Sequence, residues 1–375
     1  MEDNRPVSNQ GLEDAISETI GQPKLKVLGL GGGGSNAVNR MVEIGLDGVE
    51  FIAANTDKQA LVSSLADVNL QIGPRVTRGL GAGGDPRAGA AAAMESSREI
   101  AQALKGADMV FITAGMGGGT GTGAAPVAAE IARELGSVVV AVVTMPFAFE
   151  MNRRAQNAME GVKRLQPNAH TLITVPNDRL LQIVPKDLSL EVAFRLADDV
   201  LRQGVQGVTE LVTRAGLINV DFAHVRDMLL HGGGAIMAIG MGQGQQKASD
   251  AIKQALNHPL LKVDSLEQAR GILVHFTGGD DLALVEVGEA ITDLRSQLPE
   301  QTDLIMGASS DPDMTGRTQA ILIVTGIGGK PVSANNIATF ASKSEEPVHA
   351  ENSEKAIDEE NLDVPAFLRH RLAVR

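Results

Sequence analysis

The sequence contains no cysteine, no tryptophan and no tyrosine, and its only aromatic side chains are nine phenylalanines. Without cysteine the protein forms neither disulfides nor thiolate metal sites, which fits a reducing compartment. So few aromatic side chains argue against the stacking platforms that bind single-stranded nucleic acid. A net charge of −13 argues against a general polyanion-binding surface. We therefore expect no nucleic-acid partner, and any affinity for phosphate must be local.

Long hydrophobic runs are missing too. No stretch approaches the length of a membrane span, and residues 1–22 carry neither the basic nor the apolar region of a signal peptide. We expect a cytoplasmic protein without direct membrane insertion. At 375 residues, the chain is long enough for two or three domains.

Glycine is abundant, with 42 residues, six of which lie in Gly115–Gly123. This loop follows the apolar run Met109–Ile112, which reads as a buried strand, and precedes an expected helix, Ala124–Leu135. Glycines let backbone N–H groups approach an anion, and a helix start adds unpaired donors and a positive dipole end. Thr120 and Thr122 add hydroxyl donors. One or two glycines would suffice for a turn that only packs a helix on a sheet, so we predict that this loop binds phosphate.

Two further glycine loops repeat the pattern. Gly29–Asn36 follows an expected strand, Lys24–Leu30, and precedes an expected helix from Ala37 to Ile44. Gly79–Pro86 precedes an expected helix, Arg87–Leu104. Strands that alternate with helices at this spacing predict a parallel sheet covered on both faces. Ligands of such sheets bind beyond the carboxyl ends of the strands.

Three glycine loops, Glu150 and Asn177 all fall at these strand ends, so we expect them to converge on one pocket. The predicted fold class is α/β: a Rossmann-like parallel-sheet domain, a long central helix and a smaller mixed-sheet α/β domain. The predicted segments are a disordered leader (1–23), the parallel-sheet domain (24–187), the central helix (188–214), the smaller domain (215–328), an acidic linker (329–360) and a terminal peptide (361–375). The terminal peptide combines apolar and basic residues after an acidic tract, which favours docking on partners.

The loop Gly117–Gly123 resembles the signature loop of the tubulin superfamily. The surrounding motifs resemble its FtsZ branch, the bacterial tubulin-like division GTPases. These motifs, in chain order, are Gly31–Asn36, Asn55–Asp57, Gly79–Pro86, Asn177–Asp178, Asn219–Phe222 and the terminal Asp363–Arg369. The resemblance covers about residues 24–328 and the terminal peptide.

This resemblance implies a site for GTP, with Mg²⁺ bridging phosphate oxygens and no dedicated metal site in the protein. The implied phosphate contacts are Gly32, Gly33, Gly34, Ser35, Asn36, Gly118, Gly119, Thr120 and Gly121. Glu150 and Arg154 resemble the ribose contacts, and Asn177 and Asp198 the guanine contacts. A carboxylate accepts from both guanine N1–H and the exocyclic amine, a pair that adenine lacks. Asp199 cannot face the same way as Asp198, so only one of the two reads the base.

The resemblance also implies head-to-tail polymers that form a division ring at mid-cell. Asn219, Asp221 and His224 would meet the γ-phosphate of the next subunit, with Asp221 orienting the attacking water. Membrane-tethering and regulatory division proteins would bind the terminal peptide. The family usually has an acid where this chain has His224. An imidazole cannot hold water or a cation through negative charge, so we expect turnover that is slowed or pH-dependent.

Two other functions stay open at this stage. Gly29, Gly31 and Gly34 also match the dinucleotide pattern of an NAD-dependent oxidoreductase. That alternative lacks the ribose-binding acid and leaves the other glycine loops without a role. The second alternative is a scaffold that binds GTP without hydrolysing it. No Gly-Lys-Ser/Thr follows any glycine loop, which argues against a P-loop NTPase. Asp57 either caps a helix or faces a cation bound to the nucleotide.

Overall fold

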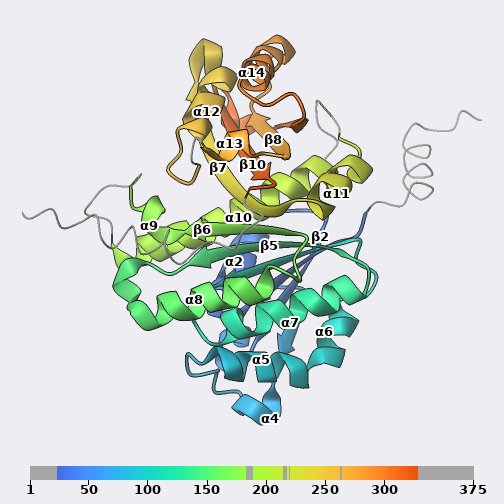
Figure 1. Ribbon diagram of the computed structural model, residues 1–375, viewed down its shortest axis with the longest axis vertical. Helices are drawn as coiled ribbons and strands as arrows, with labels where there is room; N and C mark the ends of the chain where they lie inside the picture. Colours follow the sequence, from blue (N-terminus) through green and yellow to red (C-terminus); the bar gives the residue numbers. More distant parts are fainter. Residues whose placement is uncertain (1–22, 183–188, 214–217, 219, 262–263, 328–375) are drawn as a thin grey trace, which may run out of the picture. The chain divides into compact units, whose positions relative to one another are not determined.

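The computed structural model describes residues 23–182, 189–213, 218, 220–261 and 264–327 (Figure 1). Pro23 apart, the predicted leader, linker and terminal peptide lie outside these residues. The strands are β1 (Leu25–Leu30), β2 (Val49–Asn55), β3 (Val68–Gln71), β4 (Met109–Gly115), β5 (Val138–Met145), β6 (Thr171–Pro176), β7 (Gly233–Gln243), β8 (Gly271–Gly278), β9 (Asp303–Ser310) and β10 (Arg317–Thr325).

The helices include one long element, α10, and three short 3-10 turns. The α-helices are α2 (Gly31–Glu43), α3 (Lys58–Val62), α4 (Pro74–Thr77), α5 (Pro86–Glu95), α6 (Ser97–Leu104), α7 (Thr120–Glu134), α8 (Asn152–Leu165), α9 (Asn177–Leu180), α10 (Leu190–Thr213), α11 (Phe222–Leu230), α12 (Lys247–Leu256), α13 (Asp264–Glu267) and α14 (Leu284–Ser296). The 3-10 turns are η1 (Ala148–Glu150), η2 (Gly244–Gln246) and η3 (Pro312–Met314).

All ten of these strands form one sheet, in the order β3-β2-β1-β4-β5-β6-β7-β10-β8-β9. From β3 to β6 every pairing is parallel, which confirms the predicted Rossmann-like part. The order reverses between β1 and β4, and this switch point is where doubly wound sheets bind their ligands. The second part is mixed, because β10 runs antiparallel to both β7 and β8.

The two parts of the sheet are continuous through a short junction. β6 pairs with the start of β7 over only three residues, Thr171–Ile173 against Gly233–Ala235. The sequence predicts a second α/β domain with mixed strands but gives no sign that its strands extend the first sheet. Pairing between strands this far apart leaves no local pattern in the sequence.

Helices cover both faces of the parallel part. The core on one face joins α2, α10 and α11 to the strands, and the core on the other face joins α6, α7 and α8. A third core packs α12 and α14 on one face of the second set of strands. The other face of that set, which includes Leu273 and Ile321, packs into the same core as α10. α10 therefore supports both parts of the sheet (Figure 1).

Three predicted helices differ from the observed ones. α7 begins at Thr120 and not at Ala124, so the end of the central glycine loop forms its first turn. α2 begins at Gly31 and not at Ala37, because the glycine segment itself forms the first turns of the helix. The predicted helix Arg87–Leu104 is wrong as a single element, since it divides into α5 and α6 at Ser96. The buried Ser96 hydroxyl accepts the Gly73 N–H at 3.0 Å, which gives this break a tertiary cause. α8, in contrast, has the predicted bounds.

Among the helices whose residues are described, none is long and apolar enough to cross a membrane.

Candidate nucleotide site

Two helices begin at the switch point without a side chain to cap them. α2 follows β1 directly, α7 follows β4 through the central glycine loop, and neither N-cap residue makes a side-chain hydrogen bond. In contrast, an aspartate caps each of α3, α5 and α11. A helix start leaves up to four backbone N–H groups without an intrahelical partner. At α2 and α7 these donors stay available for an anionic ligand.

The backbones of the glycine loops Gly29–Asn36 and Gly115–Gly123 are in direct contact. Gly31 has a φ of +68°, and a Cβ atom there would lie 2.9 Å from the Gly121 nitrogen. A Cβ atom on Gly33 would lie 3.2 Å from the Gly115 nitrogen. The helix starts of α2 and α7 are therefore in contact, and only residues without a Cβ permit this approach.

The third glycine loop, Gly79–Pro86, also contacts the start of α7. A Cβ atom on Gly119 would lie 2.7 Å from the Ala82 side chain and 3.1 Å from the Asp85 backbone. Asp85 caps α5 by accepting from the Arg87 N–H at 2.9 Å. The three loops that the sequence predicts to converge therefore do so at the carboxyl ends of β1 and β4.

Threonine hydroxyls hold these loops together. Thr120 Oγ1 lies 2.6 Å from Thr56 Oγ1, which joins α7 to the segment after β2. The Thr122 side chain is buried and accepts the Gly117 N–H at 2.8 Å, so this hydroxyl closes the central loop. Asp57 accepts from the Gln59 N–H at 2.8 Å, so it caps α3, which is the first of its two predicted roles.

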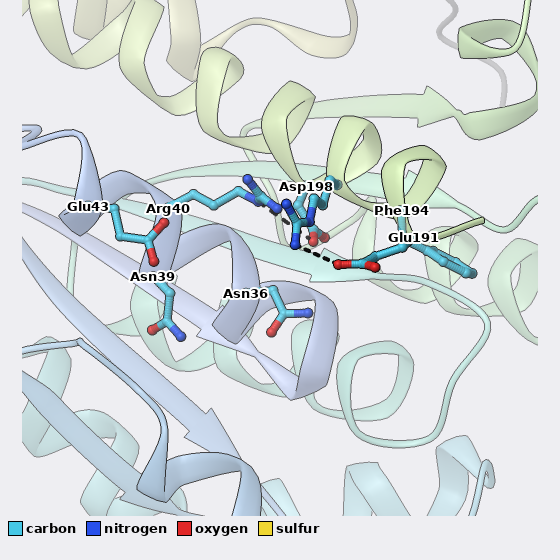
Figure 2. Close-up of a pocket in the computed structure, with 8 residues that line it drawn as sticks. Asn36, Asn39, Arg40, Glu43, Glu191, Phe194 and Asp198 are labelled. Carbon is cyan, nitrogen blue, oxygen red and sulfur yellow. Dashed lines mark hydrogen bonds and ion pairs between the residues drawn. The ribbon is translucent and has the colours of Figure 1, made fainter. Parts of the chain in front are cut away.

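A pocket of about 350 Å³ adjoins these loops, between α2 and α10 (Figure 2). Asn36 and Arg40 line it from α2, and Phe194 and Asp198 line it from α10. Its remaining lining residues are Asn39, Glu43, Glu191 and Arg195. The structure thus brings Asn36 and Asp198, predicted for phosphate and guanine, to one pocket.

Asp198 is the electrostatically unusual group of this pocket. Burial raises the pKa of its carboxyl to about 7, the Arg40 guanidinium opposes this rise, and the neighbouring Asp199 carboxylate adds to it. The Arg40 Nε atom is 3.9 Å from Asp198 Oδ2, which is too long for a strong charge-assisted hydrogen bond. Asp199 does not line the pocket, so the structure separates the two neighbouring acids as expected.

The predicted ribose contacts follow β5: Glu150 ends the loop between β5 and α8, and Arg154 lies in the first turn of α8. Arg154 forms an ion pair with Glu150, whose Oε1 also accepts the Phe147 N–H at 2.9 Å. The Phe147 ring lies edge-on to Phe194 at 5.5 Å between centroids, which connects this loop to the pocket. The loop also contacts α9, because the Ala148 N–H donates to Asp178 Oδ1 at 2.9 Å.

Asn177, the first residue of α9, presents a buried acceptor. The residue is 4% exposed, and its Oδ1 atom has no hydrogen-bond partner among the described residues. The Ser35 hydroxyl in α2 is likewise buried and without a partner there. Buried polar atoms are normally hydrogen-bonded, so two such atoms beside the loops favour a polar ligand.

Asp221 and His224 lie elsewhere, at the start of α11. Asp221 caps this helix by accepting from the Ala223 N–H at 2.9 Å, and both side chains are exposed. Asn219, the third predicted catalytic residue, lies outside the described residues. In the part of the chain that the structure describes, no three His, Cys, Asp or Glu side chains gather to hold a metal ion.

Comparisons with known proteins match both parts of the chain. Residues 24–185 match the family model for the Tubulin/FtsZ family, GTPase domain, and residues 233–328 match that for the FtsZ family, C-terminal domain. The structure is similar to an empty FtsZ dimer from M. jannaschii, with a TM-score of 0.81 and 43% identity, covering 85% of this chain and 93% of that one. The chain belongs to the tubulin/FtsZ family.

Other members of the family show the same fold. A point mutant of M. jannaschii FtsZ matches with a TM-score of 0.80 and 44% identity, over 85% of this chain and 95% of that one. CetZ2 from Haloferax volcanii, in a GTPγS-bound protofilament, matches with a TM-score of 0.70 over 85% of this chain and 97% of that one. At 22% identity, CetZ2 supports the fold alone.

Membership of the tubulin/FtsZ family makes this chain a tubulin-like cytoskeletal GTPase, which binds GTP. The described residues fit that ligand. Two helix starts have no side-chain cap, the contact of Gly31 with Gly121 excludes any side chain, and Asn177 carries a buried acceptor without a partner among the described residues. The oxidoreductase alternative finds no support in the family of GTPases.

Sequence reasoning missed several residues that line the pocket. Arg40 follows Asn36 by four residues on α2, and Phe194 precedes Asp198 by four on α10. Side chains four residues apart share one face of a helix. That spacing from the predicted contacts was therefore a usable signal for both residues.

Proposed function

We propose that this GTPase polymerises head to tail into cytoplasmic filaments of the division ring at mid-cell, and that it hydrolyses GTP at the joints between subunits. One observation carries this proposal: the pocket with Asp198 and the exposed Asp221 belong to opposite ends of α10. The rise of a helix puts Asp198 about 22 Å from Thr213, where α10 ends. Figure 1 shows α9, beside the nucleotide loops, and α11 at opposite ends of α10.

The course of the chain supports a second molecule as the source of Asp221. β6 begins at Thr171, whose hydroxyl donates to the Leu229 carbonyl near the end of α11 at 2.6 Å. β6 ends immediately before Asn177. The end of α11 therefore lies at the amino end of this strand, and the nucleotide loops lie at its carboxyl end. Two different faces that complement each other form a head-to-tail contact, which produces an open filament when the rotation between subunits does not close a ring.

In this proposal the nucleotide lies across the switch point. Backbone N–H groups of Gly32–Asn36 and Gly118–Gly121 bind the phosphates, and Glu150 with Arg154 binds the ribose after exchanging their mutual ion pair for hydroxyl contacts. Asn177 and Asp198 bind the guanine. Mg²⁺ would neutralise charge on the phosphates, held by phosphate oxygens and water.

Hydrolysis then depends on positioning by the next subunit. Asp221 uses Oδ1 to cap α11, which leaves Oδ2 for the attacking water. Asn219 and His224 are the other two residues that we propose to act at this step. His224 lies three residues after Asp221 and is exposed, so both side chains can face an incoming γ-phosphate. An imidazole offers a base but no permanent negative charge, so turnover should depend on pH.

The terminal peptide, residues 361–375, is proposed to bind membrane-tethering and regulatory division proteins. Its apolar and basic residues follow an acidic linker of 32 residues (329–360), long enough to keep the peptide accessible on a filament.

Assembly and hydrolysis are tested together by sedimentation with GTP and with GDP. The proposal predicts pelleting filaments with GTP, and filaments with strongly reduced phosphate release for Asp221→Asn. His224→Asp should raise turnover and flatten its pH profile. A chain that hydrolyses GTP while remaining monomeric in sedimentation would contradict the proposal, and an unchanged pH profile for His224→Asp would remove the role of His224.

A further inference from the structure

Asp199 lies next to the proposed guanine contact but has different partners. Its Oδ1 atom accepts from Arg202 Nε at 2.6 Å, and its Oδ2 atom accepts from Gln203 Nε2. Asp198 faces the pocket and Arg40 instead (Figure 2). Two consecutive carboxylates on α10 therefore belong to two separate sets of contacts.

Arg202 is held in place at both ends of its guanidinium. Besides Asp199, it donates through Nη1 to Gln206 Oε1, and Gln206 Nε2 donates in turn to Glu210 Oε1 at 2.8 Å. The Arg202 side chain is only 15% exposed. The cation is therefore fixed beside Asp199 by a chain of hydrogen bonds along α10, unlike the freely solvated arginines of the surface.

The charges around Asp198 show which cation compensates each of the two neighbouring carboxylates. Arg40 and Glu43 face the pocket from α2, and Glu191 and Arg195 face it from α10. Glu191 and Arg195 neutralise each other at 2.5 Å. Arg40 is thus the cation that balances Asp198, and the charge of Asp199 opposes ionisation of Asp198. Arg202 is the group that compensates Asp199.

We propose that Arg202 is a positioning residue for guanine recognition. It neutralises Asp199, so that Arg40 compensates the charge of Asp198 alone, and Asp198 stays ionised when the base binds. This inference rests on the proposed role of Asp198 as the guanine contact. Arg202 touches neither the base nor the phosphates and acts through the charge of its neighbour.

The test is GDP affinity between pH 5.5 and 8.5, measured by calorimetry on the full chain. GDP avoids hydrolysis, and the titration of its phosphates is common to all variants, so differences between variants report on the protein. For the wild type we expect affinity to rise with pH and to level off above a midpoint near the Asp198 pKa of about 7. Arg202→Gln should move this midpoint up by about half to one pH unit. At pH 7 it should weaken GDP binding about two- to fivefold, with much less effect at pH 8.5.

Removing the opposite charge makes the test specific. Asp199→Asn should move the midpoint down, and the double variant should return close to the wild type, because the net charge of the pair is then zero again. Arg202→Lys keeps the charge and should largely rescue Arg202→Gln. Arg164→Gln removes the same charge from an exposed pair with Glu160 and serves as the matched control.

The outcomes separate this inference from the proposed function. If the wild type shows a midpoint and Arg202→Gln leaves it unchanged, the inference is wrong while the role of Asp198 stands. A loss of affinity that is equal at every pH, or shifts in the same direction for Arg202→Gln and Asp199→Asn, would make Arg202 merely structural and overturn the inference. If Asp198→Asn binds GDP as the wild type does, the proposed guanine site itself is wrong.

Discussion

Arg40 Nε lies 3.9 Å from Asp198 Oδ2, across the boundary between α2 and α10. The helix that carries Arg40 begins at the proposed phosphate loop, and the helix that carries Asp198 supports both parts of the sheet. The pair therefore joins the proposed phosphate and base sites. At this distance the pair compensates burial only in part, which leaves the pKa of Asp198 at about 7.

Guanine nucleotide binding should depend on this ionisation. Guanine donates two hydrogen bonds, so it requires the carboxylate, and the free protein holds a proton on Asp198 below about pH 7. Affinity should therefore fall as pH decreases through 7, by up to about tenfold per unit. Asp198→Asn should weaken GTP binding by about 1.5–3 kcal/mol and remove the part of the pH dependence that Asp198 causes. Calorimetry in two buffers of different ionisation enthalpy measures the proton released; no proton release near pH 7 would contradict this assignment.

The contact between the loops Gly29–Asn36 and Gly115–Gly123 predicts that a side chain at Gly31 destabilises the protein, whereas a side chain at Gly32 does not. Gly31→Ala forces an alanine into a left-handed conformation and places its Cβ 2.9 Å from the Gly121 nitrogen. We expect the free energy of unfolding to fall by about 2 kcal/mol or more, with loss of GTP binding. Gly32→Ala is the matched control for stability, because no atom lies within 4 Å of its Cβ. Equal urea midpoints for the two variants would contradict the close approach of the loops.

Two inactive variants should restore activity to each other. Asp221→Ala keeps the nucleotide pocket but loses the catalytic carboxylate, whereas Asp198→Asn keeps the carboxylate but loses guanine affinity. In a mixed filament, GTP in the first variant meets Asp221 of the second. We expect phosphate release from the mixture to exceed the sum of the two variants alone. A simple sum, under conditions where both variants sediment together, would argue for a site complete within one chain.

His170 should make the fold sensitive to acid. Its Nδ1 atom accepts the Val139 N–H at 2.9 Å, which requires a neutral ring. Burial lowers the pKa of this imidazole, and the charges of Arg133 and Arg226 lower it further. The contribution to stability is therefore present above pH 6.5 and is lost as pH falls below it, by up to about 1.4 kcal/mol per unit. Urea unfolding at pH 7.5 and 5.5 should show a smaller difference for His170→Gln than for the wild type. The exposed His231→Gln should leave the difference unchanged.

The parallel strands were predictable from the sequence because apolar runs such as Val138–Met145 end at glycine, proline or asparagine. The start of α2 was not, since glycine has a low helix propensity and the contact of Gly31 with Gly121 decides the conformation. The break at Ser96 has the same origin, because its partner Gly73 lies 23 residues away. The resemblance to the FtsZ branch placed Asp198 among the guanine contacts, but its partner Arg40 and its burial required the fold.

The dependence of the GTPase rate on protein concentration tests the central claim most directly. If Asp221 of one subunit completes the site of the next, the rate per molecule should be near zero below an assembly threshold and should rise steeply above it. Phosphate release at constant saturating GTP, measured across a hundredfold range of protein concentration, gives this curve. A rate strictly proportional to protein concentration over the whole range would show that one chain carries the complete site, and it would contradict the account.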